Sequence, residues 1–343
     1  MLQAAITREI ASQLRPQLSG TEQESIAKVG TKDADAYRFY LRGRYHFEKW
    51  SSEDNKAAAE FFEKAVARDS NYAAAYAGLA DAYAIEGYFG DVFGRDPFDK
   101  SRTAAKRALA LDSQIPESHL SLALVDFIYF WDFAEADAEI QRALALDPDS
   151  AYSHVVSCWF EAHMGRIGNM LTECRRALEL DPFSPVYNFS LTLAYNFSRD
   201  YNQAIEQAKK TAEIDPNSEF TLYWLGYTYE RMGNYAQAME QWTRLDKLHG
   251  RAEHAEQMMR IFQRLGYPGY LREDAKSSDA NGNFGTSAAD YAVLGEKDAA
   301  FAALDKAFAM RATFLFVKVD PVYDNIRSDP RFPELLRRIG LPQ

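Results

Sequence analysis

The sequence predicts an all-α protein built as a solenoid, which is a stack of successive helix pairs. Three observations support this prediction: a turn signal that returns at a fixed interval, apolar residues spaced three and four positions apart between the turns, and a helix-breaking glycine between the two helices of a unit. The interval has the length of a helix-turn-helix unit. One such unit cannot bury its own apolar face, so the units must stack.

The turn signal is an Asp-Pro pair or its equivalent. It falls at Asp147-Pro148, Asp181-Pro182 and Asp215-Pro216, 34 residues apart each time. Upstream, Asp112 and Asp69 are each followed by Ser and continue the series, and the longer interval between these two indicates an insertion. Proline ends the preceding helix because it cannot continue one, and Asn or Ser can cap the next helix.

Residues 219–250 show the pattern within one unit. Apolar or small residues at helical spacing mark one face of each helix: Leu222, Leu225, Gly226 and Tyr229 in the first, and Tyr235, Ala238, Trp242 and Leu245 in the second. Gly233 and Asn234 separate the helices, because glycine tolerates the left-handed conformation that a tight turn requires.

This pattern of Leu-Gly, Tyr, Gly-Asn-Tyr, Ala, a large residue and finally Pro resembles the tetratricopeptide repeat (TPR). The resemblance is strongest over residues 73–242. It implies a right-handed α-solenoid of about eight helix-turn-helix units, and these begin near residues 37, 73, 117, 151, 185, 219, 252 and 285. The repeats predict an organisation in three parts: an N-terminal helical segment (1–33), the TPR solenoid (34–311) with an insertion at 86–98, and a C-terminal capping segment (312–343).

The flanks carry a second resemblance. The stretches LQAAITREIASQLRPQLS, DAYRFYLRGRYHF and DPRFPELLRRIGL look like the C-terminal TPR region of bacterial multidomain signalling proteins. In those proteins the repeats follow a serine/threonine kinase, winged-helix or cyclase domain. No Gly-rich loop with a following Lys, His-Arg-Asp loop or basic recognition helix occurs in this chain. The resemblance therefore implies a sensing or partner-binding region, or a free-standing descendant of one.

Composition and motifs exclude several classes of function. The formal net charge of −11, from 39 basic and 50 acidic residues, would repel nucleic acid. No window is apolar enough for a membrane span, and the start lacks the pattern of a signal peptide. We expect a cytoplasmic protein, or an extracytoplasmic one if a parent protein is membrane-anchored. The histidines lack metal-ligand spacing, and the stretch 86–98 lacks the Lys of a phosphate loop, so no metal or cofactor is predicted.

Three features allow two interpretations each. Cys158 and Cys174 are expected as small buried apolar residues, with a disulfide in an oxidising compartment as the alternative. The aromatic residues of the insertion at 86–98 are expected to pack internally, with a binding lip as the alternative. The run TFLFVKV (313–319) has local β character, and we expect an extended segment that covers the end of the solenoid.

The resemblance also implies a concave groove lined by the first helix of each unit. The inward-facing positions of the third to seventh units give the candidate peptide-binding residues Tyr129, Tyr152, Trp159, His163, Phe189, Asn196, Phe197, Phe220, Tyr223, Tyr227, Arg231 and Arg260. An exposed row of aromatic residues usually binds something. The alternative is that these side chains pack between neighbouring units. The basic clamp that binds chaperone carboxylates is excluded because the matching positions are mostly apolar.

These observations predict a non-enzymatic interaction scaffold that binds a peptide or protein segment in an aromatic groove, in signalling or regulation. The alternative is a self-associating regulatory segment of a kinase, cyclase or transcription regulator, which would form a homo-oligomer. No enzyme is predicted, because no nucleophile, base and orienting group stand out together.

Overall fold

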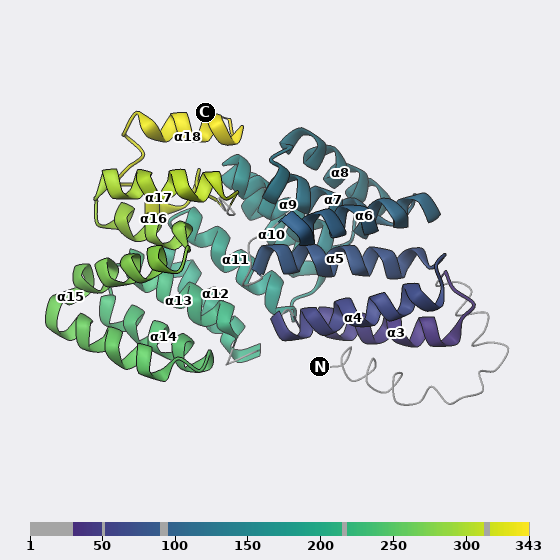
Figure 1. The fold of residues 1–343 in the computed structure, drawn as a ribbon, viewed down its shortest axis with the longest axis horizontal. Coiled ribbons are helices and arrows are strands. Elements are labelled where there is room, and N and C mark those ends of the chain that lie inside the picture. Colours follow the sequence, from purple (N-terminus) through teal and green to yellow (C-terminus); the bar gives the residue numbers. More distant parts are fainter. Residues whose placement is uncertain (1–29, 50–51, 90–94, 215–217, 312–315, 343) are drawn as a thin grey trace. The chain divides into compact units, whose positions relative to one another are not determined.

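The described part of the chain is mostly helical. The computed structural model describes residues 30–342 with four gaps, which are residues 50–51, 90–94, 215–217 and 312–315. Every regular element in this part is a helix and none is a strand, so the all-α prediction is confirmed there (Figure 1). The predicted N-terminal helical segment, 1–33, lies outside the described residues except for residues 30–33.

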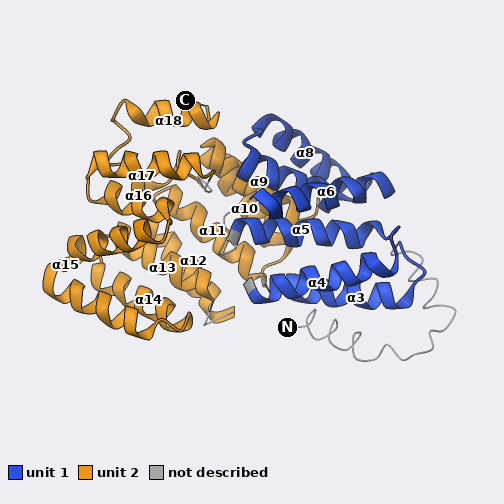
Figure 2. Ribbon diagram, in the orientation of Figure 1, with its two compact units in different colours: residues 1–148 blue, residues 149–343 orange. Residues whose placement is uncertain are grey.

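The chain divides into two compact units. Unit 1 comprises residues 1–148 and unit 2 comprises residues 149–343 (Figure 2). Each consists of consecutive helix pairs, and in the following we call the earlier helix of a pair its first helix. The surface formed by the first helices of one unit is called the first-helix face of that unit.

The described part of unit 1 contains three helix pairs. These pairs are α3 (Ala34–Phe47) with α4 (Ser52–Arg68), α5 (Ala73–Phe89) with α6 (Arg95–Leu111), and α7 (Pro116–Val125) with α8 (Phe133–Leu146). A π-helical turn, Asp126–Phe130, extends α7. Within the insertion predicted at 86–98, α5 continues to Phe89 and α6 begins at Arg95, so residues on both sides of the gap at 90–94 are helical.

Close helix packing in unit 1 centres on Phe62 of α4. This ring is fully buried and lies against Gly43 of α3 and Gly78 of α5. A Cβ atom added at either glycine would lie 2.6 Å from the ring, which no real contact permits. The absence of a side chain at these two positions therefore lets one aromatic ring join three helices. In the next pair Phe98 is buried and stacks on Tyr129 with ring centroids 4.7 Å apart, which agrees with internal packing.

Unit 2 contains five helix pairs and a C-terminal extension. Its helices are α9 (Ala151–Met164), α10 (Ile167–Leu180), α11 (Pro185–Phe197), α12 (Tyr201–Ile214), α13 (Glu219–Arg231), α14 (Tyr235–Leu248), α15 (Ala252–Ala280), α16 (Phe284–Val293), α17 (Lys297–Ala309) and α18 (Arg331–Ile339). Gly266 inside α15 has φ 68° and ψ −174°, so α15 is two helices that form the seventh pair. The described residues thus contain the eight pairs that the period predicts.

The turn between α9 and α10 shows how the local sequence sets the pairing. Gly165 takes a φ of 78° at the end of α9, and the amide of Arg166 donates to the carbonyl of Glu161 at 2.9 Å. This arrangement satisfies the carbonyl groups that a helix leaves open at its C-terminus. At the start of α9, Ser150 Oγ accepts from the amide of Ser153 at 3.1 Å. Ser150 therefore caps the start of α9 and Gly165 ends it, at the positions that the repeat pattern indicates.

The two cysteines lie inside the fourth helix pair. Cys158 of α9 and Cys174 of α10 are fully buried, and they are joined by a disulfide with a Cα–Cα distance of 5.3 Å. The expected burial is confirmed. The covalent pairing is the alternative that the sequence left open.

Residues 316–327, which we call the strap, follow the gap at 312–315. Of the run 313–319, which was expected to be extended, residues 313–315 lie outside the described residues, and residues 316–319 form turns instead. The amides of Val319 and Asp320 both donate to the carbonyl of Phe316, at 2.8 and 2.9 Å, and a 3₁₀ turn follows at Pro321–Tyr323. Arg327 then donates to the carbonyls of Lys318 at 2.6 Å and Asp320 at 2.7 Å. The β character of this run was therefore misleading, because the turn depends on contacts with residues distant in the sequence.

Helix α18 covers the last pair. Arg331 donates to Asp298 at 2.9 Å and Arg338 to Asp305 at 2.6 Å, and both acceptors lie on α17. The apolar side chains of Phe332, Leu335, Leu336 and Ile339 are buried on its inner side. A terminal repeat needs such a cover because no further repeat buries its apolar face.

Candidate functional site

The first-helix face of unit 2 carries most of the predicted groove residues, and the strap lies along it. The strap contacts α9, the end of α11, α13 and α16, all of which are first helices or their ends. These contacts join residues more than 30 positions apart in the sequence.

Phe316 is an aromatic anchor at the beginning of the strap. Its ring lies 4.6 Å from the ring of His163 and 5.0 Å from that of Phe197, between centroids. The side chain is only 5% exposed. Burial lowers the pKa of His163 to about 4, so the imidazole that meets Phe316 is neutral near pH 7. A neutral ring can pack against an apolar one without desolvating a charge.

Lys318 lies over the C-terminal end of α9. Its Nζ donates to the carbonyl of Met164 at 3.2 Å. The carbonyl end of a helix attracts a cation. Gly165 packs against the side chain of Lys318, and a Cβ atom added at Gly165 would lie 2.8 Å from Cε of Lys318. Burial, and then the neighbouring guanidinium of Arg166, lower the pKa of Lys318.

Asp320 is the polar centre of the contact. The hydroxyl of Tyr227 donates to its Oδ1 at 2.5 Å, and the amide of Val322 donates to the same oxygen at 2.9 Å. Burial raises the pKa of Asp320, while these two hydrogen bonds and the charge of Arg231 oppose the rise. Tyr227 itself is 4% exposed. Its hydroxyl therefore has a defined acceptor inside the interface.

The later part of the strap is held at two further places. Arg199 donates to both carboxylate oxygens of Asp324, at 2.8 and 2.9 Å. Asn325 Nδ2 donates to the carbonyls of Ala292 at 3.2 Å and Val293 at 2.9 Å, at the end of α16. The strap thus reaches from the fourth helix pair to the eighth.

Three other predicted residues form an aromatic row on the same face. The ring centroids of Trp159 and Phe189 are 6.4 Å apart, and those of Phe189 and Phe220 are 4.7 Å apart, with nearly parallel planes in both pairs. Trp159 Nε1 donates to Ser190 Oγ at 3.0 Å. Near this row Tyr223 is 46% exposed, which makes it the most accessible of the predicted aromatic residues.

Five of the predicted residues remain. Asn196 is fully buried and bonds Thr228 and Thr192 at 3.0 Å each. Arg231 pairs with Glu230 beside the Tyr227 ring. The other three are distributed more widely: Arg260 is exposed and pairs with Glu256 at 3.7 Å, Tyr152 is half-buried on α9, and Tyr129 belongs to unit 1. The groove assignment of all twelve residues stays a prediction.

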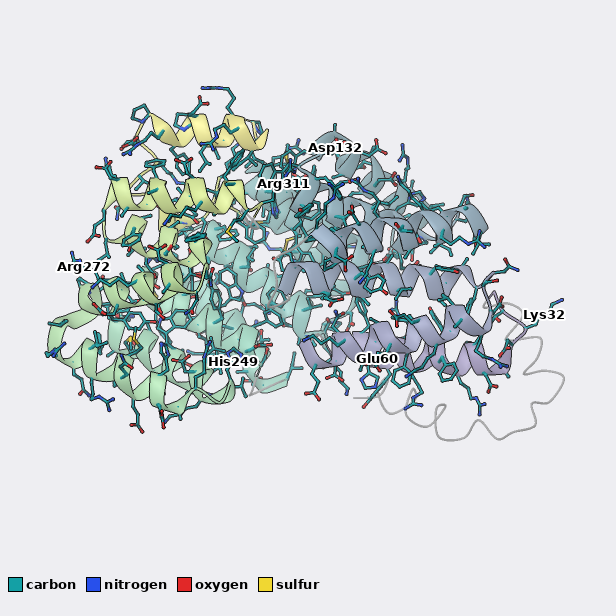
Figure 3. All side chains as sticks on the ribbon, in the orientation of Figure 1. Lys32, Glu60, Asp132, His249, Arg272 and Arg311 are labelled. Carbon is teal, nitrogen blue, oxygen red and sulfur yellow. A yellow bond between two sulfur atoms is a disulfide. The ribbon has the colours of Figure 1, made fainter. Side chains whose placement is uncertain are left out.

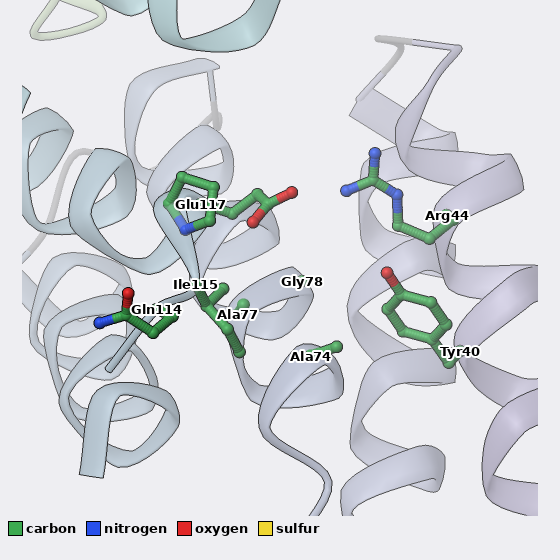
Figure 4. Close-up of a pocket in the computed structure, with 9 residues that line it drawn as sticks. Tyr40, Arg44, Ala74, Ala77, Gly78, Gln114, Ile115 and Glu117 are labelled. Atoms are coloured by element: carbon green, nitrogen blue, oxygen red, sulfur yellow. The ribbon is translucent and has the colours of Figure 1, made fainter. Parts of the chain in front are cut away.

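A hollow of about 150 Å³ lies on the first-helix face of unit 1, and sequence reasoning missed it (Figure 4). Its lining residues are Tyr40, Arg44, Ala74, Ala77, Gly78, Gln114, Ile115, Pro116 and Glu117. The side chains of Arg44 and Glu117 face each other across it, and no ion pair within 4.0 Å joins them among the described contacts (Figure 4). The sequence signal that could have indicated this hollow was the pair Tyr40 and Arg44, which lie one helical turn apart on α3.

Charged groups elsewhere among the described residues include surface ion pairs and a buried pair of carboxyl groups. On the surface, pairs such as Arg272 with Glu296, at 2.8 Å, are ordinary exposed ion pairs (Figure 3). Inside unit 2, burial beside Asp274 raises the pKa of Asp290 well above its usual range. Within the described residues, no cluster of three or more metal-ligating side chains occurs. None of the described helices is both long and apolar enough to cross a membrane.

Comparisons with known proteins identify the repeat and the fold. Residues 208–240, from α12 into α14, match the tetratricopeptide repeat model. Human IFIT1, as a dimer with PPP-AAAA, has a similar structure with a TM-score of 0.56 and 18% identity over 81% of this chain and 73% of that chain. The Cut9-Hcn1 hetero-tetramer of the APC/C gives a TM-score of 0.52 and 16% identity over 74% of this chain and 51% of that chain.

These likenesses show the fold of a TPR solenoid. A third structure, YrrB, described as a TPR protein with an unusual peptide-binding site, is 20% identical over 58% of this chain and 99% of that chain, with a TM-score of 0.37. No curated protein matches the sequence. The predicted resemblance to the TPR is thus confirmed for the repeat and the fold, and the link to multidomain signalling proteins stays a prediction.

Proposed function

We propose that the chain is a non-enzymatic interaction scaffold, acting in signalling or regulation, whose unit 2 binds a peptide or protein segment on its first-helix face. One observation supports this most directly. On that face His163, Phe197 and Tyr227 hold a stretch of turns, residues 316–320, through a ring contact, a hydrogen bond and burial. These are the contacts that a bound peptide would make.

The chemistry of the face fits peptide recognition. Aromatic residues dominate binding energies because they bury much area with few rotatable bonds. The aromatic row of Trp159, Phe189 and Phe220 lies on the same first helices. Trp159 and Phe189 are only 5% and 6% exposed and pack inside the face, so Tyr223, which is 46% exposed, is the aromatic side chain that a ligand can reach. A ligand with apolar or aromatic anchors is therefore favoured over a strongly charged one.

A displayed random peptide library, panned against the full chain, tests this proposal. Affinities of the selected peptides are then measured by fluorescence anisotropy for wild type, Tyr223→Ser and Tyr235→Ser. Tyr235 is a matched control because it is 43% exposed, against 46% for Tyr223, but lies on the second helix α14. We expect Tyr223→Ser to weaken binding about tenfold or more and Tyr235→Ser to leave it unchanged. If no peptide is enriched, or both variants bind like wild type, the proposal is wrong.

Self-association as a regulatory segment is the second candidate. Phe183 in unit 2 favours it, because this side chain is 73% exposed, more than any other exposed large apolar side chain of the described residues, and a second copy of the chain would cover it. Sedimentation velocity at several protein concentrations separates the two functions. A single monomeric species over the whole range contradicts self-association, whereas a dimer lost in Phe183→Ser supports it.

The compartment is also a proposal. A cytoplasmic location was expected, but the Cys158–Cys174 disulfide favours the extracytoplasmic alternative, because disulfides are rare in the reducing cytosol. Counting alkylated thiols in protein taken directly from the source cells decides this. Two blocked cysteines support the extracytoplasmic location, and two free thiols support the cytoplasm.

A further inference from the structure

We infer that residues 316–320, Phe-Val-Lys-Val-Asp, are an intramolecular occupant of the peptide site on unit 2 and compete with its partner. The partner is then a peptide turn that carries an aromatic residue, a basic residue two positions later and an acidic residue two positions after that. This inference rests on the proposed function, and it specifies both the ligand class and the regulation of the same site.

Three alternate side chains of this stretch each meet a separate receptor group. Phe316 packs against the rings of His163 and Phe197, Lys318 meets the carbonyl at the end of α9, and Asp320 accepts from Tyr227. An aromatic contact, a helix C-terminus and a phenol hydroxyl select for different chemistry. Together they recognise the order aromatic, basic, acidic, while the buried Val317 and Val319 between them supply the apolar part of the cover.

Residues 316–320 are bound to the face with a strained backbone, so that a partner peptide without this strain can replace them. Phe316 has a φ of 60°, a region that bulky residues avoid because Cβ approaches the backbone carbonyl. The ammonium of Lys318 is partly desolvated and lies near the like charge of Arg166. A free peptide could present the same three side chains with a relaxed backbone. Such a peptide would therefore bind the first-helix face of unit 2 more tightly than residues 316–320 would if they were not covalently attached to it.

The rest of the C-terminal region can stay bound while residues 316–320 leave. Asn325 and Arg199 hold the strap beyond residue 320, and α18 is fixed to α17 by Arg331 and Arg338. The exchange breaks the bonds from Arg327 to the carbonyls of Lys318 and Asp320, but it leaves the cover of the last helix pair in place. The proposed competition is therefore local.

The test uses the full chain and a labelled peptide, FVKVDPVYDNIR, with the sequence of residues 316–327. Fluorescence anisotropy measures binding to wild type and to Phe316→Ser/Asp320→Asn, after circular dichroism confirms equal helicity. We expect the variant to bind the peptide at least about tenfold more tightly than wild type. Adding Tyr227→Phe to the variant should remove that binding. A folded variant that binds no better than wild type overturns the inference.

Two controls keep the result decisive. Lys318→Glu is a milder way to release residues 316–320 from the face, because it places a carboxylate against the carbonyl end of α9. This variant is used in place of the double variant if the double variant unfolds. Arg331→Met/Glu334→Gln in α18 changes charges outside the strap and should bind the peptide no better than wild type. A peptide with Phe316→Ser and Asp320→Asn should bind neither protein, and equal binding of both peptides overturns the inference.

The library-selected peptides separate this inference from the proposed function. If they bind wild type and bind Phe316→Ser/Asp320→Asn more tightly, both proposals are supported. If they bind both proteins equally, unit 2 binds ligands without competition from residues 316–320, so the inference fails and the proposed function stands. If no peptide from either source binds, both fail.

Discussion

The two first-helix faces of this chain are built from the same repeat but hold different things. In unit 1 the face is hollow, because the inward residues of α5 are Ala74, Ala77 and Gly78. In unit 2 the face presents large aromatic side chains and holds the strap. The difference shows that the repeat fixes the positions of inward-facing residues, while the size of those residues decides whether the face is a cavity or a wall.

Charge differs between the faces as well. The hollow in unit 1 has Arg44 and Glu117 on opposite sides, with no ion pair between them (Figure 4). Arg44 pairs instead with Glu48 at the end of its own helix, at 3.9 Å. On unit 2 the charged groups of the strap are paired, as Asp324 is with Arg199 and Asp320 is with the hydroxyl of Tyr227. A filled face must satisfy its buried polar groups with partners from the strap and the face.

The largest expected effect tests whether the two units are independent in stability. Phe62→Ala removes the ring that joins α3, α4 and α5 and should destabilise unit 1 by about 3–5 kcal/mol. Amide hydrogen exchange, read by mass spectrometry, should show faster exchange in unit 1 with no change in unit 2. Phe183→Ala, at a side chain that is 73% exposed, should change little in either unit. Faster exchange in both units would show that they unfold together.

The second prediction compares one phenol hydroxyl on each face. Tyr227→Phe removes one of the two donors to the buried Asp320 and leaves only the amide of Val322, so it should destabilise unit 2 by about 1–3 kcal/mol. Tyr40→Phe is the counterpart in the hollow of unit 1, where the described contacts include no hydrogen bond for the hydroxyl, and should change stability by less than about 0.5 kcal/mol. Urea unfolding of both variants gives the two values. Equal losses would contradict the contrast between a filled and a hollow face.

The third prediction concerns acid. The pKa of His163 falls from 6.5 to about 4 in the folded chain, so below pH 6.5 the unfolded state binds more protons than the folded state. Stability from this group should therefore fall by about 1.4 kcal/mol per pH unit between pH 6.5 and about 4. Burial raises the pKa of Asp320, Asp274 and Asp290, which favours the folded state in acid and opposes this trend.

The contribution of His163 is isolated by comparing wild type with His163→Gln, which cannot titrate. Urea unfolding at pH 7 and pH 5 gives the stability of each protein. The stability of wild type relative to that of His163→Gln should decrease as the pH falls. If the difference is independent of pH, the imidazole is not buried as the contact with Phe316 requires.

Local signals made the helix pairs predictable. The Asp-Pro turns and the glycine near the end of α9 act within a few residues, so the period gave the eight pairs, including the seventh, where Gly266 divides α15. The burial of Cys158 and Cys174 followed from their places in one unit. Periodicity therefore accounts for the helix pairs of the described residues, but not for the strap.

The strap and the hollow were not predictable by the same means. Phe316 meets His163 and Phe197 across more than 100 residues, and its positive φ has no sequence signal of the kind that glycine gives. The apolar run around it was therefore interpreted as an extended cover. The hollow depends on small residues of α5 opposite Tyr40 and Arg44, and inward-facing positions were counted only from the third unit onwards.

The smallest expected effect concerns the outer end of the strap. Arg199→Met removes the ion pair with Asp324, whose partners are 48% and 42% exposed, and should destabilise unit 2 by only about 0.2–1 kcal/mol, less at high salt. Arg199 also has a φ of 64°, which glycine adopts without penalty. Arg199→Gly should therefore be less destabilised than Arg199→Met, by up to about 1 kcal/mol. Thermal unfolding at two salt concentrations measures both. If Arg199→Met lowers the free energy of unfolding by more than about 2 kcal/mol, the strap is held mainly by its exposed end. The buried contacts of Phe316 and Asp320 would then contribute less to the filled face than this ion pair does.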